Sequence, residues 1–313
     1  MSHPEQSKKS NPESEPGEVD VDFVYYMFDW DDNILHMPTK IYLEKKTPEG
    51  WVPYEVSTAE FSLIRGDTEN YRPIEEDWDK AFEEFYDIGR RGEEAFLEDT
   101  MAALKPVIKD RDRGGPSFRR FRKALIEGRL FAIITARAHS SMSIRRGVEY
   151  FIEMMLTDEE KLRMIENLRR YNLFFGERDA EMGNEEVLNK YLDLNRYRGV
   201  TSPEFQNLVG KQIESGAESP AVAKQFAIRD FVKHVISLVH GRDSEAPISI
   251  GFSDDDAHNV ATVQAFIAQE LSAEFPDIRF VVYDTSDPDV PRGRKTVITG
   301  QLELDLDHLP NDA

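Results

Sequence analysis

Short apolar runs alternate along this chain with longer stretches in which apolar side chains recur every three or four residues. A short apolar run between turn signals is typical of a buried strand, and the recurring spacing is typical of an amphipathic helix. The strands expected on this basis are 23–28, 130–134, 248–252, 278–284 and 295–304. Because these runs alternate with helical stretches, we expect an α/β fold with a doubly wound, mostly parallel sheet.

The stretch after the first expected strand predicts a hairpin. Residues 40–56 consist of two β-prone runs around the turn sequence Pro-Glu-Gly, which is the pattern of two strands joined by a tight turn. Ser57 and Glu60 follow with the spacing of a capping box, so a helix is expected to begin there. We therefore expect a hairpin flap near the end of the first strand, followed by mainly helical residues up to 115.

The domain organisation follows from these patterns. The second long interruption is polar and mostly helical, with one possible strand near 197–201. The N-terminal residues are rich in Ser, Pro, Glu and Lys, which is typical of disorder. We expect a disordered N-terminal tail at 1–20, an α/β core at 21–300 with inserted cap-like segments at about 40–116 and 138–218, and a C-terminal tail at 301–313.

A long amphipathic helix is expected to begin at Pro220, with Ser219 as its N-cap. Its apolar stripe consists of Val222, Phe226, Val232, Val235, Ile236 and Val239. Lys224 lies off this stripe, which is also the position of an ordinary solvated lysine.

Composition narrows the set of partners. Of the 313 residues, 39 are Lys or Arg and 60 are Asp or Glu, which gives a formal net charge of −21. Nucleic acid and anionic membranes need positive charge on the protein, so neither is expected as a partner. The chain has no cysteine, which excludes disulfides, thiolate metal sites and thiol nucleophiles. No apolar run approaches the ~18 residues of a membrane span, and the N-terminal residues lack an apolar signal core, so a cytoplasmic location is expected.

Polar residues follow three of the expected strands. Asp29, Asp31 and Asp32 come directly after the first strand, Thr135 follows the second, and the aspartates 254–256 follow the third. Ligands of an open parallel sheet bind beyond the carboxyl ends of its strands, so these groups meet in one crevice if the three strands are neighbours. Carboxylates this close repel one another unless a cation or a shared proton neutralises them. Two facing carboxylate clusters therefore predict a site for Mg²⁺, a hard cation.

The order of these motifs resembles that of the haloacid dehalogenase-like (HAD) superfamily of phosphohydrolases. FDWDDN matches the family's first motif, an apolar strand followed by Asp-x-Asp, and FAIITAR matches the second, an apolar strand ending in Thr or Ser. SPAVAKQF is the candidate for the third motif, a Lys near the start of a helix, and IGFSDDDAHN matches the fourth, an apolar strand with paired aspartates and often an Asn. The resemblance spans residues 23–283 and implies a Rossmann-type core.

The resemblance implies a role for each matched residue. Asp29 would be the nucleophile that becomes an aspartyl phosphate, and Asp31 would be the general acid and base. Lys224 would offset the negative charge of Asp29 and the phosphate. Thr135 would bind a phosphoryl oxygen, and the implied substrate-binding set is Thr135, Ala136 and Arg137. The implied ligands of Mg²⁺ are the Asp29 carboxylate, the Asp31 backbone carbonyl, Asp254 and, through water, Asp255.

The residues leave several assignments open. The metal pair is either Asp254 with Asp255 or Asp255 with Asp256, and the first choice places Asn259 where the family often has its Asn. Lys211 and Lys233 compete with Lys224 for the third motif, and Arg137 also fits a surface residue. Asn33 stands where the family commonly has Thr or Val.

A calcium loop of the EF-hand type is excluded, although the spacing of Asp29, Asp31 and Asn33 fits its first ligands. Ile34 stands where such a loop needs Gly, and Lys40 stands where it needs a bidentate Glu.

We therefore expect a Mg²⁺-dependent phosphatase that forms an aspartyl phosphate on Asp29 and acts on a small phosphorylated metabolite. A protein that keeps the HAD fold as a catalytically weak binding or regulatory module is one alternative, and a phosphoprotein phosphatase is another. The sequence contains no phosphate-binding P-loop, no dinucleotide-binding glycine motif and no Gly-x-Ser-x-Gly elbow.

Overall fold

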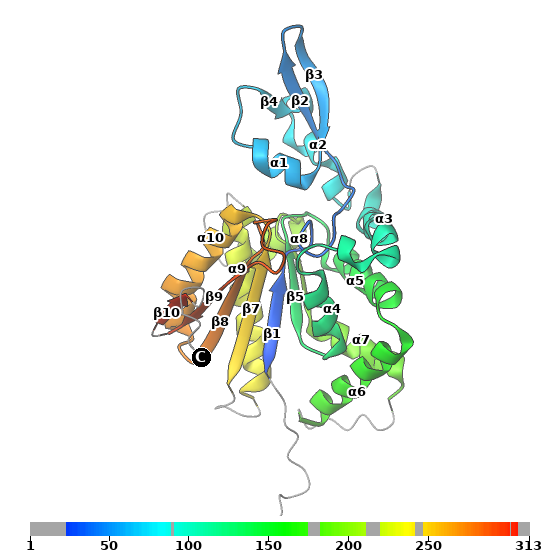
Figure 1. The fold of residues 1–313 in the computed structure, drawn as a ribbon, viewed down its shortest axis with the longest axis vertical. Helices are drawn as coiled ribbons and strands as arrows, with labels where there is room; N and C mark the ends of the chain where they lie inside the picture. The colour runs from blue at the N-terminus through cyan, green and yellow to red at the C-terminus, as the bar shows by residue number, and fades with distance from the viewer. Residues whose placement is uncertain are drawn as a thin grey trace, which may run out of the picture.

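A seven-stranded sheet forms the centre of the protein (Figure 1). The computed structural model describes residues 23–88, 91–174, 182–210, 220–241, 247–300 and 302–305, without the side chains of 173–174 and 302–305. The strand order is β10-β9-β8-β7-β1-β5-β6, with parallel pairing from β8 to β6 and antiparallel pairing at β9 and β10. The strands are β1 (Val24–Phe28), β5 (Phe131–Thr135), β6 (Arg196–Gly199), β7 (Ile248–Asp254), β8 (Ile278–Asp284), β9 (Arg294–Thr299) and β10 (Leu302–Asp305). The expected α/β fold with a mostly parallel sheet is confirmed.

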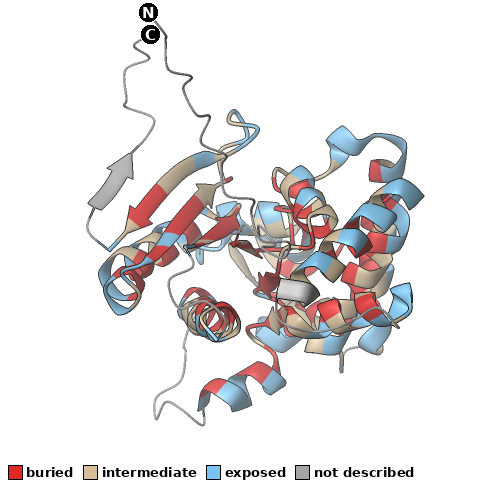
Figure 2. Cartoon of the chain, turned by 90° about the horizontal axis from the view of Figure 1, so that it is seen from below, coloured by how far each residue is buried: buried red, intermediate tan, exposed pale blue. Residues whose placement is uncertain are grey.

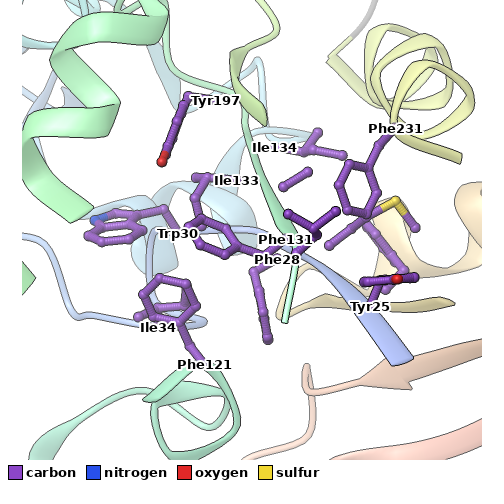
Figure 3. Packing of buried hydrophobic residues seen from close by; sticks show 14 of the residues in the cluster. Tyr25, Phe28, Trp30, Ile34, Phe121, Phe131, Ile133, Ile134, Tyr197 and Phe231 are labelled. Atoms are coloured by element: carbon purple, nitrogen blue, oxygen red, sulfur yellow. The ribbon is translucent and has the colours of Figure 1, made fainter. Parts of the chain in front are cut away.

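Helices cover both faces of this sheet. Successive side chains of a strand point to opposite faces, so Tyr25 and Phe28 of β1 lie on different sides. Phe28 packs edge to face against Phe121 of α4 (Phe118–Ile126), with ring centroids 5.4 Å apart. On the other side, α9 (Pro220–Val239) turns Phe231 toward the sheet, on the same side of β1 as Tyr25 (Figure 3). A third helix, α10 (Ala257–Phe266), continues through a π-helical turn (Ile267–Leu271) into α11 (Ser272–Glu274).

The described helices of the second expected insertion pack against the sheet and do not form a cap. The helices in this part of the chain are α5 (Ser141–Met155), α6 (Asp158–Phe174), α7 (Asn184–Leu194) and α8 (Pro203–Gly210). Buried side chains of these helices, such as Val148, Phe151 and Tyr191, belong to the same apolar core as the central strands. Figure 2 shows buried residues concentrated on the strands and on the helix faces turned toward them. Apolar side chains at helical spacing in this segment therefore cover the sheet, whereas a cap over the site was expected.

A small module lies beyond the carboxyl ends of the central strands (Figure 1). We call residues 41–86 the flap module. It contains a separate three-stranded sheet of order β3-β2-β4 and its own small apolar cluster, which includes Leu43, Val56 and Phe85. Its elements are β2 (Ile41–Thr47), β3 (Gly50–Val56), α1 (Thr58–Ile64), β4 (Tyr71–Pro73) and α2 (Trp78–Ala81). The structure contains the expected hairpin and the expected Ser57–Glu60 capping box.

The prediction of mainly helical structure up to 115 is wrong for much of that stretch. It contains β4 and short 3₁₀ turns at Ile74–Glu76, Glu83–Phe85, Gly92–Glu94 and Arg111–Arg113. The one long helix in it is α3 (Ala95–Lys109), which packs against α5 and not over the site. Several acidic residues of the flap module form ion pairs with basic residues across turns and strands. A composition typical of helices therefore does not produce helices there.

Other boundaries shift slightly. In α9, Val232, Val235 and Val239 are buried as expected, but Val222 is 38% exposed. The expected strand at 295–304 is the hairpin of β9 and β10, so the expected C-terminal tail includes a strand. The expected N-cap Ser219 and the tail at 1–20 lie outside the described residues. Within the described part of the chain, no helix combines the length and apolar character needed to cross a membrane.

Candidate active site

The strand order brings the three expected polar motifs together. β1 lies between β7 and β5, so the residues that follow these three parallel strands share one edge of the sheet. Trp30 anchors the loop after β1, because its ring is buried among Phe96, Phe121 and Phe151 at centroid distances of 5.6, 5.9 and 6.3 Å. The buried indole fixes the backbone between the two aspartates of the first motif (Figure 3).

The loop then turns sharply at Asp32, whose φ of 52° lies in the left-handed region. Aspartate and asparagine tolerate this conformation better than most residues. The Asp32 N–H donates to the carbonyl of Leu35 at 2.8 Å. Gly115 packs against this turn so closely that a Cβ atom there would lie 2.5 Å from the carbonyl oxygen of Asn33. The chain after α3 therefore needs glycine to hold the turn in place.

Asn33 joins the loops that follow β1 and β7. Its side chain is fully buried, and its Nδ2 donates to the carbonyl oxygens of Asp29 at 3.1 Å and Ser253 at 2.9 Å. Its Oδ1 accepts from the hydroxyls of Thr285 at 3.0 Å and Ser253 at 3.2 Å. Asparagine at this position thus fixes the spacing between the two acidic loops, which a Thr or Val side chain has too few polar atoms to do.

A single buried ammonium group joins the two acidic clusters. Lys224 Nζ donates to Asp29 Oδ1 at 2.9 Å and to Asp254 Oδ2 at 2.6 Å. Burial by itself lowers the pKa of Lys224, but the adjacent Asp254 and Asp29 more than reverse this, so its pKa is raised and the ammonium stays charged. The alternative of a solvated lysine at this position is wrong, since Lys224 is only 1% exposed.

The other two lysine candidates do not occupy this site. Lys233 is 57% exposed and pairs with Glu274 at 3.1 Å. Lys211 lies outside the described residues.

Three carboxylates form a cluster with the geometry of a cation site. Asp29, Asp254 and Asp255 each place an oxygen within 4.8 Å of the other two. Burial raises the pKa of Asp29 to about 8, with Lys224 opposing the shift and Asp254 and Asp31 adding to it. Burial also raises the pKa of Asp255, and the charges of Asp29 and Asp254 add to that shift. The donor set fits a hard divalent cation, because all its atoms are oxygens and their charge needs compensation.

The neighbouring Asp256 has a different role. Its side chain caps α10 by accepting from the N–H groups of His258 at 2.8 Å and Asn259 at 3.2 Å. It also pairs with Arg65 of the flap module. The structure therefore groups Asp254 and Asp255 with Asp29, as the preferred alignment expected. Asn259 Nδ2 lies 3.4 Å from Asp254 Oδ1.

The Asp31 carboxylate lies apart from this cluster and faces Arg137. The Arg137 guanidinium donates from Nε and Nη2 to both Asp31 oxygens at 2.6–3.0 Å, and the Thr135 hydroxyl donates to Asp31 Oδ2 at 3.2 Å. Arg137 is only 1% exposed, so the alternative of a surface arginine is wrong. Its guanidinium holds Asp31 in this structure, whereas the resemblance implied contact with substrate.

A second carboxylate, that of Asp99, also lies close to the Arg137 guanidinium. Asp99 of α3 lies 3.9 Å from Arg137 Nη1 and 2.7 Å from Arg91 Nη2, and Thr39 donates to Asp99 and accepts from Arg137. Sequence reasoning missed Thr39 and Asp99. Neither sits in a recognisable motif, and only the packing of α3 against the loop before β2 brings them to the site.

Two polar contacts attach the flap module to the acidic loops. Thr58, the first residue of α1, donates to Asp32 Oδ2 at 2.5 Å, and Arg65 at the end of α1 pairs with Asp256 at 3.0 Å. A cavity of about 490 Å³ lies between the flap module and the sheet edge. Asp29, Asp31, Thr135, Ala136 and Lys224 line it, which places the expected catalytic and substrate-binding residues around one space.

Comparison of the chain with family models, with curated proteins and with solved structures gives no match.

Proposed function

We propose that this protein is a Mg²⁺-dependent phosphatase of the HAD type with Asp29 as its nucleophile. One observation carries this proposal: the Lys224 ammonium bridges Asp29 and Asp254 at the edge of a three-carboxylate cluster that lines a covered cavity. A carboxylate can approach an anionic phosphate only where cations cancel their repulsion, and this arrangement provides that compensation.

Asp29, Asp254 and Asp255 would hold the ion, with the Asp31 carbonyl as the further ligand that the resemblance implies. When bound, Mg²⁺ would supply positive charge to the phosphoryl oxygens and orient the phosphate. The lysine ammonium keeps Asp29 from being repelled by the incoming phosphate. Asp29 attacks phosphorus, and the bond between phosphorus and the leaving oxygen breaks as the aspartyl phosphate forms.

Asp31 acts as the general acid and base in both steps. In its protonated form it gives a proton to the leaving oxygen in the first step, and as the resulting carboxylate it takes a proton from the attacking water in the second. Its clamp by Arg137 and Thr135 orients the carboxyl group, and we assign Arg137 a positioning role. The Thr135 hydroxyl, which contacts Asp31 in the free protein, would turn to a phosphoryl oxygen when substrate is present.

A small phosphorylated metabolite is favoured over a phosphoprotein because the flap module covers the carboxylates and is attached to both acidic loops. The binding-protein alternative would be favoured by an Asn33 without a structural role and by a lysine that does not reach Asp29. Asn33 instead has four hydrogen bonds that hold the loops in register, and Lys224 contacts Asp29 directly. The cytoplasmic location stays a prediction.

The test is phosphate release from a panel of phosphate monoesters, with Mg²⁺ and with excess chelator. Asp29→Asn should remove turnover without unfolding the protein, because the change is nearly isosteric. Asp289→Asn, at an exposed aspartate, is the matched control and should keep wild-type activity. Full activity in chelator, or in Asp29→Asn, would contradict the proposal.

A further inference from the structure

The flap module lines the cavity with aromatic rings. Phe61 of α1 and Phe82 meet edge to face with ring centroids 5.4 Å apart, and Phe82 meets Phe85 in the same way at 5.5 Å. Phe85 lies against Arg137, whose guanidinium carbon is 4.7 Å from the ring centroid. All three rings line the same cavity as the carboxylates. Aromatic faces and edges of this kind favour contact with another flat, apolar group.

The same wall offers few polar groups to a substrate. The hydroxyl of Thr58 donates to Asp32, the hydroxyl of Ser62 donates to the carbonyl of Ala59, and Arg65 pairs with Asp256. Tyr86 adds one phenol hydroxyl to this wall. A leaving group with many hydroxyls would bury them here with too few partners, and each unpaired buried polar group costs free energy.

Charge sets a second condition. Six carboxylates and three cationic side chains line the cavity, and the three cations, Arg65, Arg137 and Lys224, are each paired with carboxylates. One divalent cation and one dianionic phosphoryl group together leave the net charge of the cavity unchanged. A second phosphate or a carboxylate on the substrate would therefore meet an excess of negative charge.

We propose that the substrate is an aromatic phosphate monoester, with one phosphoryl group on a flat, apolar leaving group that carries no second anionic group. The phosphoryl group lies at the carboxylates, and the aromatic part packs against Phe61, Phe82 and Phe85. This inference rests on the phosphatase function proposed above. The experiments below distinguish failure of that function from failure of the inference.

The first comparison uses the wild-type protein with Mg²⁺ and two substrates, 2-naphthylmethyl phosphate and glycerol 3-phosphate. Both release a primary alcohol, so their leaving groups ionise similarly and the comparison reports binding of the non-reacting part. We expect kcat/KM to be at least about tenfold higher for the naphthylmethyl ester. A carboxylate added to the far ring should lower that value. Equal values for the two substrates, or a preference for glycerol 3-phosphate, would overturn the inference.

The second comparison uses two variants of α1. Phe61→Asn removes a ring that lines the cavity, and Leu63→Asn changes a residue of the same helix that is 85% exposed and absent from the cavity wall. Phe61→Asn should lower kcat/KM for the naphthylmethyl ester about tenfold more than it lowers kcat/KM for glycerol 3-phosphate. Leu63→Asn should change neither. An equal loss for both substrates in Phe61→Asn would contradict an aromatic subsite. Phe61→Leu replaces this variant if the asparagine prevents folding.

The third comparison does not require turnover. Titration calorimetry with Mg²⁺ measures binding of 2-naphthylmethylphosphonate and of methylphosphonate to the wild-type protein. Tighter binding of the naphthyl compound without hydrolysis of any ester would overturn the phosphatase function and support the aromatic subsite. Hydrolysis of both esters with equal binding of both phosphonates would support the phosphatase function and overturn the aromatic subsite.

Discussion

Lys224 and Asp29 are 195 positions apart in the sequence, and Lys224 Nζ donates a 2.9 Å hydrogen bond to Asp29 Oδ1. The same ammonium donates to Asp254 Oδ2 at 2.6 Å. Asp29 follows β1 and Asp254 ends the neighbouring parallel strand β7, so their repulsion opposes the pairing of those strands. The buried lysine therefore serves both the fold and the proposed reaction.

Replacing Lys224 should separate its effect on stability from its effect on the proposed reaction. Lys224→Met leaves two buried carboxylates without their cation, which should lower the free energy of unfolding by about 3–5 kcal/mol. Added Mg²⁺ should restore part of this stability, because it binds the same carboxylates in the folded state. Activity should fall at least about 100-fold even at saturating Mg²⁺. Lys233→Met on the exposed face of α9 is the control, and urea unfolding with and without Mg²⁺ is the measurement. Equal stability of the two variants without Mg²⁺ would count against the bridge.

The clamp on Asp31 predicts a split between the two chemical steps. An aryl phosphate with an acidic leaving group needs little proton donation, so Asp31→Asn should still form the aspartyl phosphate. Hydrolysis of that intermediate needs a base, so it should slow at least about 100-fold. Stopped-flow kinetics should then show a burst of the aryl alcohol followed by slow turnover. A variant that loses the burst together with the turnover would show that Asp31 acts mainly in the first step.

Asn33 is predicted to matter for stability as well as for the metal. Asn33→Ala leaves the hydroxyls of Ser253 and Thr285 and two carbonyl oxygens without this partner, which should cost about 1–3 kcal/mol of unfolding free energy. The apparent affinity for Mg²⁺ should also fall, because the two acidic loops lose their fixed spacing. Asn207→Ala, at an exposed position, should change neither quantity.

His139 predicts how stability depends on pH. Its ring is buried 5.4 Å from that of Phe96, and within the described residues neither ring nitrogen has a hydrogen-bond partner. Burial, with the charges of Arg137 and Arg91, lowers the pKa of His139 to about 2. Below pH ~6.5 the unfolded chain therefore binds a proton that the folded protein does not bind.

The unfolding free energy should accordingly fall by about 1.4 kcal/mol for each pH unit below about 6.5, and this contribution should be constant above that pH. His139→Leu removes this titration, so its loss of stability between pH 6.5 and 5 should be smaller than that of the wild type by about 2 kcal/mol. Thermal or urea unfolding at several pH values measures the difference. Identical pH profiles for the two proteins would show that His139 is protonated in the folded state.

The sequence predicted which residues lie at the sheet edge, because this depends on local sequence pattern. Each of β1, β5 and β7 is an apolar run that ends at a polar motif, so position along the strand fixes which residues reach the edge. The stripe of α9 similarly located the core side of that helix, although it placed Val222 wrongly. These features depend on local periodicity, which one sequence displays directly.

The predictions that were wrong concern features that depend on tertiary packing. Helical periodicity in α5, α6 and α7 does not say whether these helices cover the sheet or the site, and the structure puts them on the sheet. The roles of Arg137, Thr39 and Asp99 depend on contacts between β5, α3 and the loop before β2, which lie about 40–100 positions apart. The part of the flap module after its hairpin was likewise expected to be mainly helical, whereas it contains β4 and short 3₁₀ turns.

In the proposed reaction, Asp29 carries the phosphoryl group during turnover. The most direct measurement mixes the protein with Mg²⁺ and an aryl phosphate, stops the reaction with acid within milliseconds, and locates added mass by peptide mass spectrometry. We expect one phosphoryl group on the peptide that contains Asp29, and none on the same peptide in Asp29→Asn. Phosphate release with no phosphorylated peptide at any time, or a phosphoryl group on another residue, would contradict it.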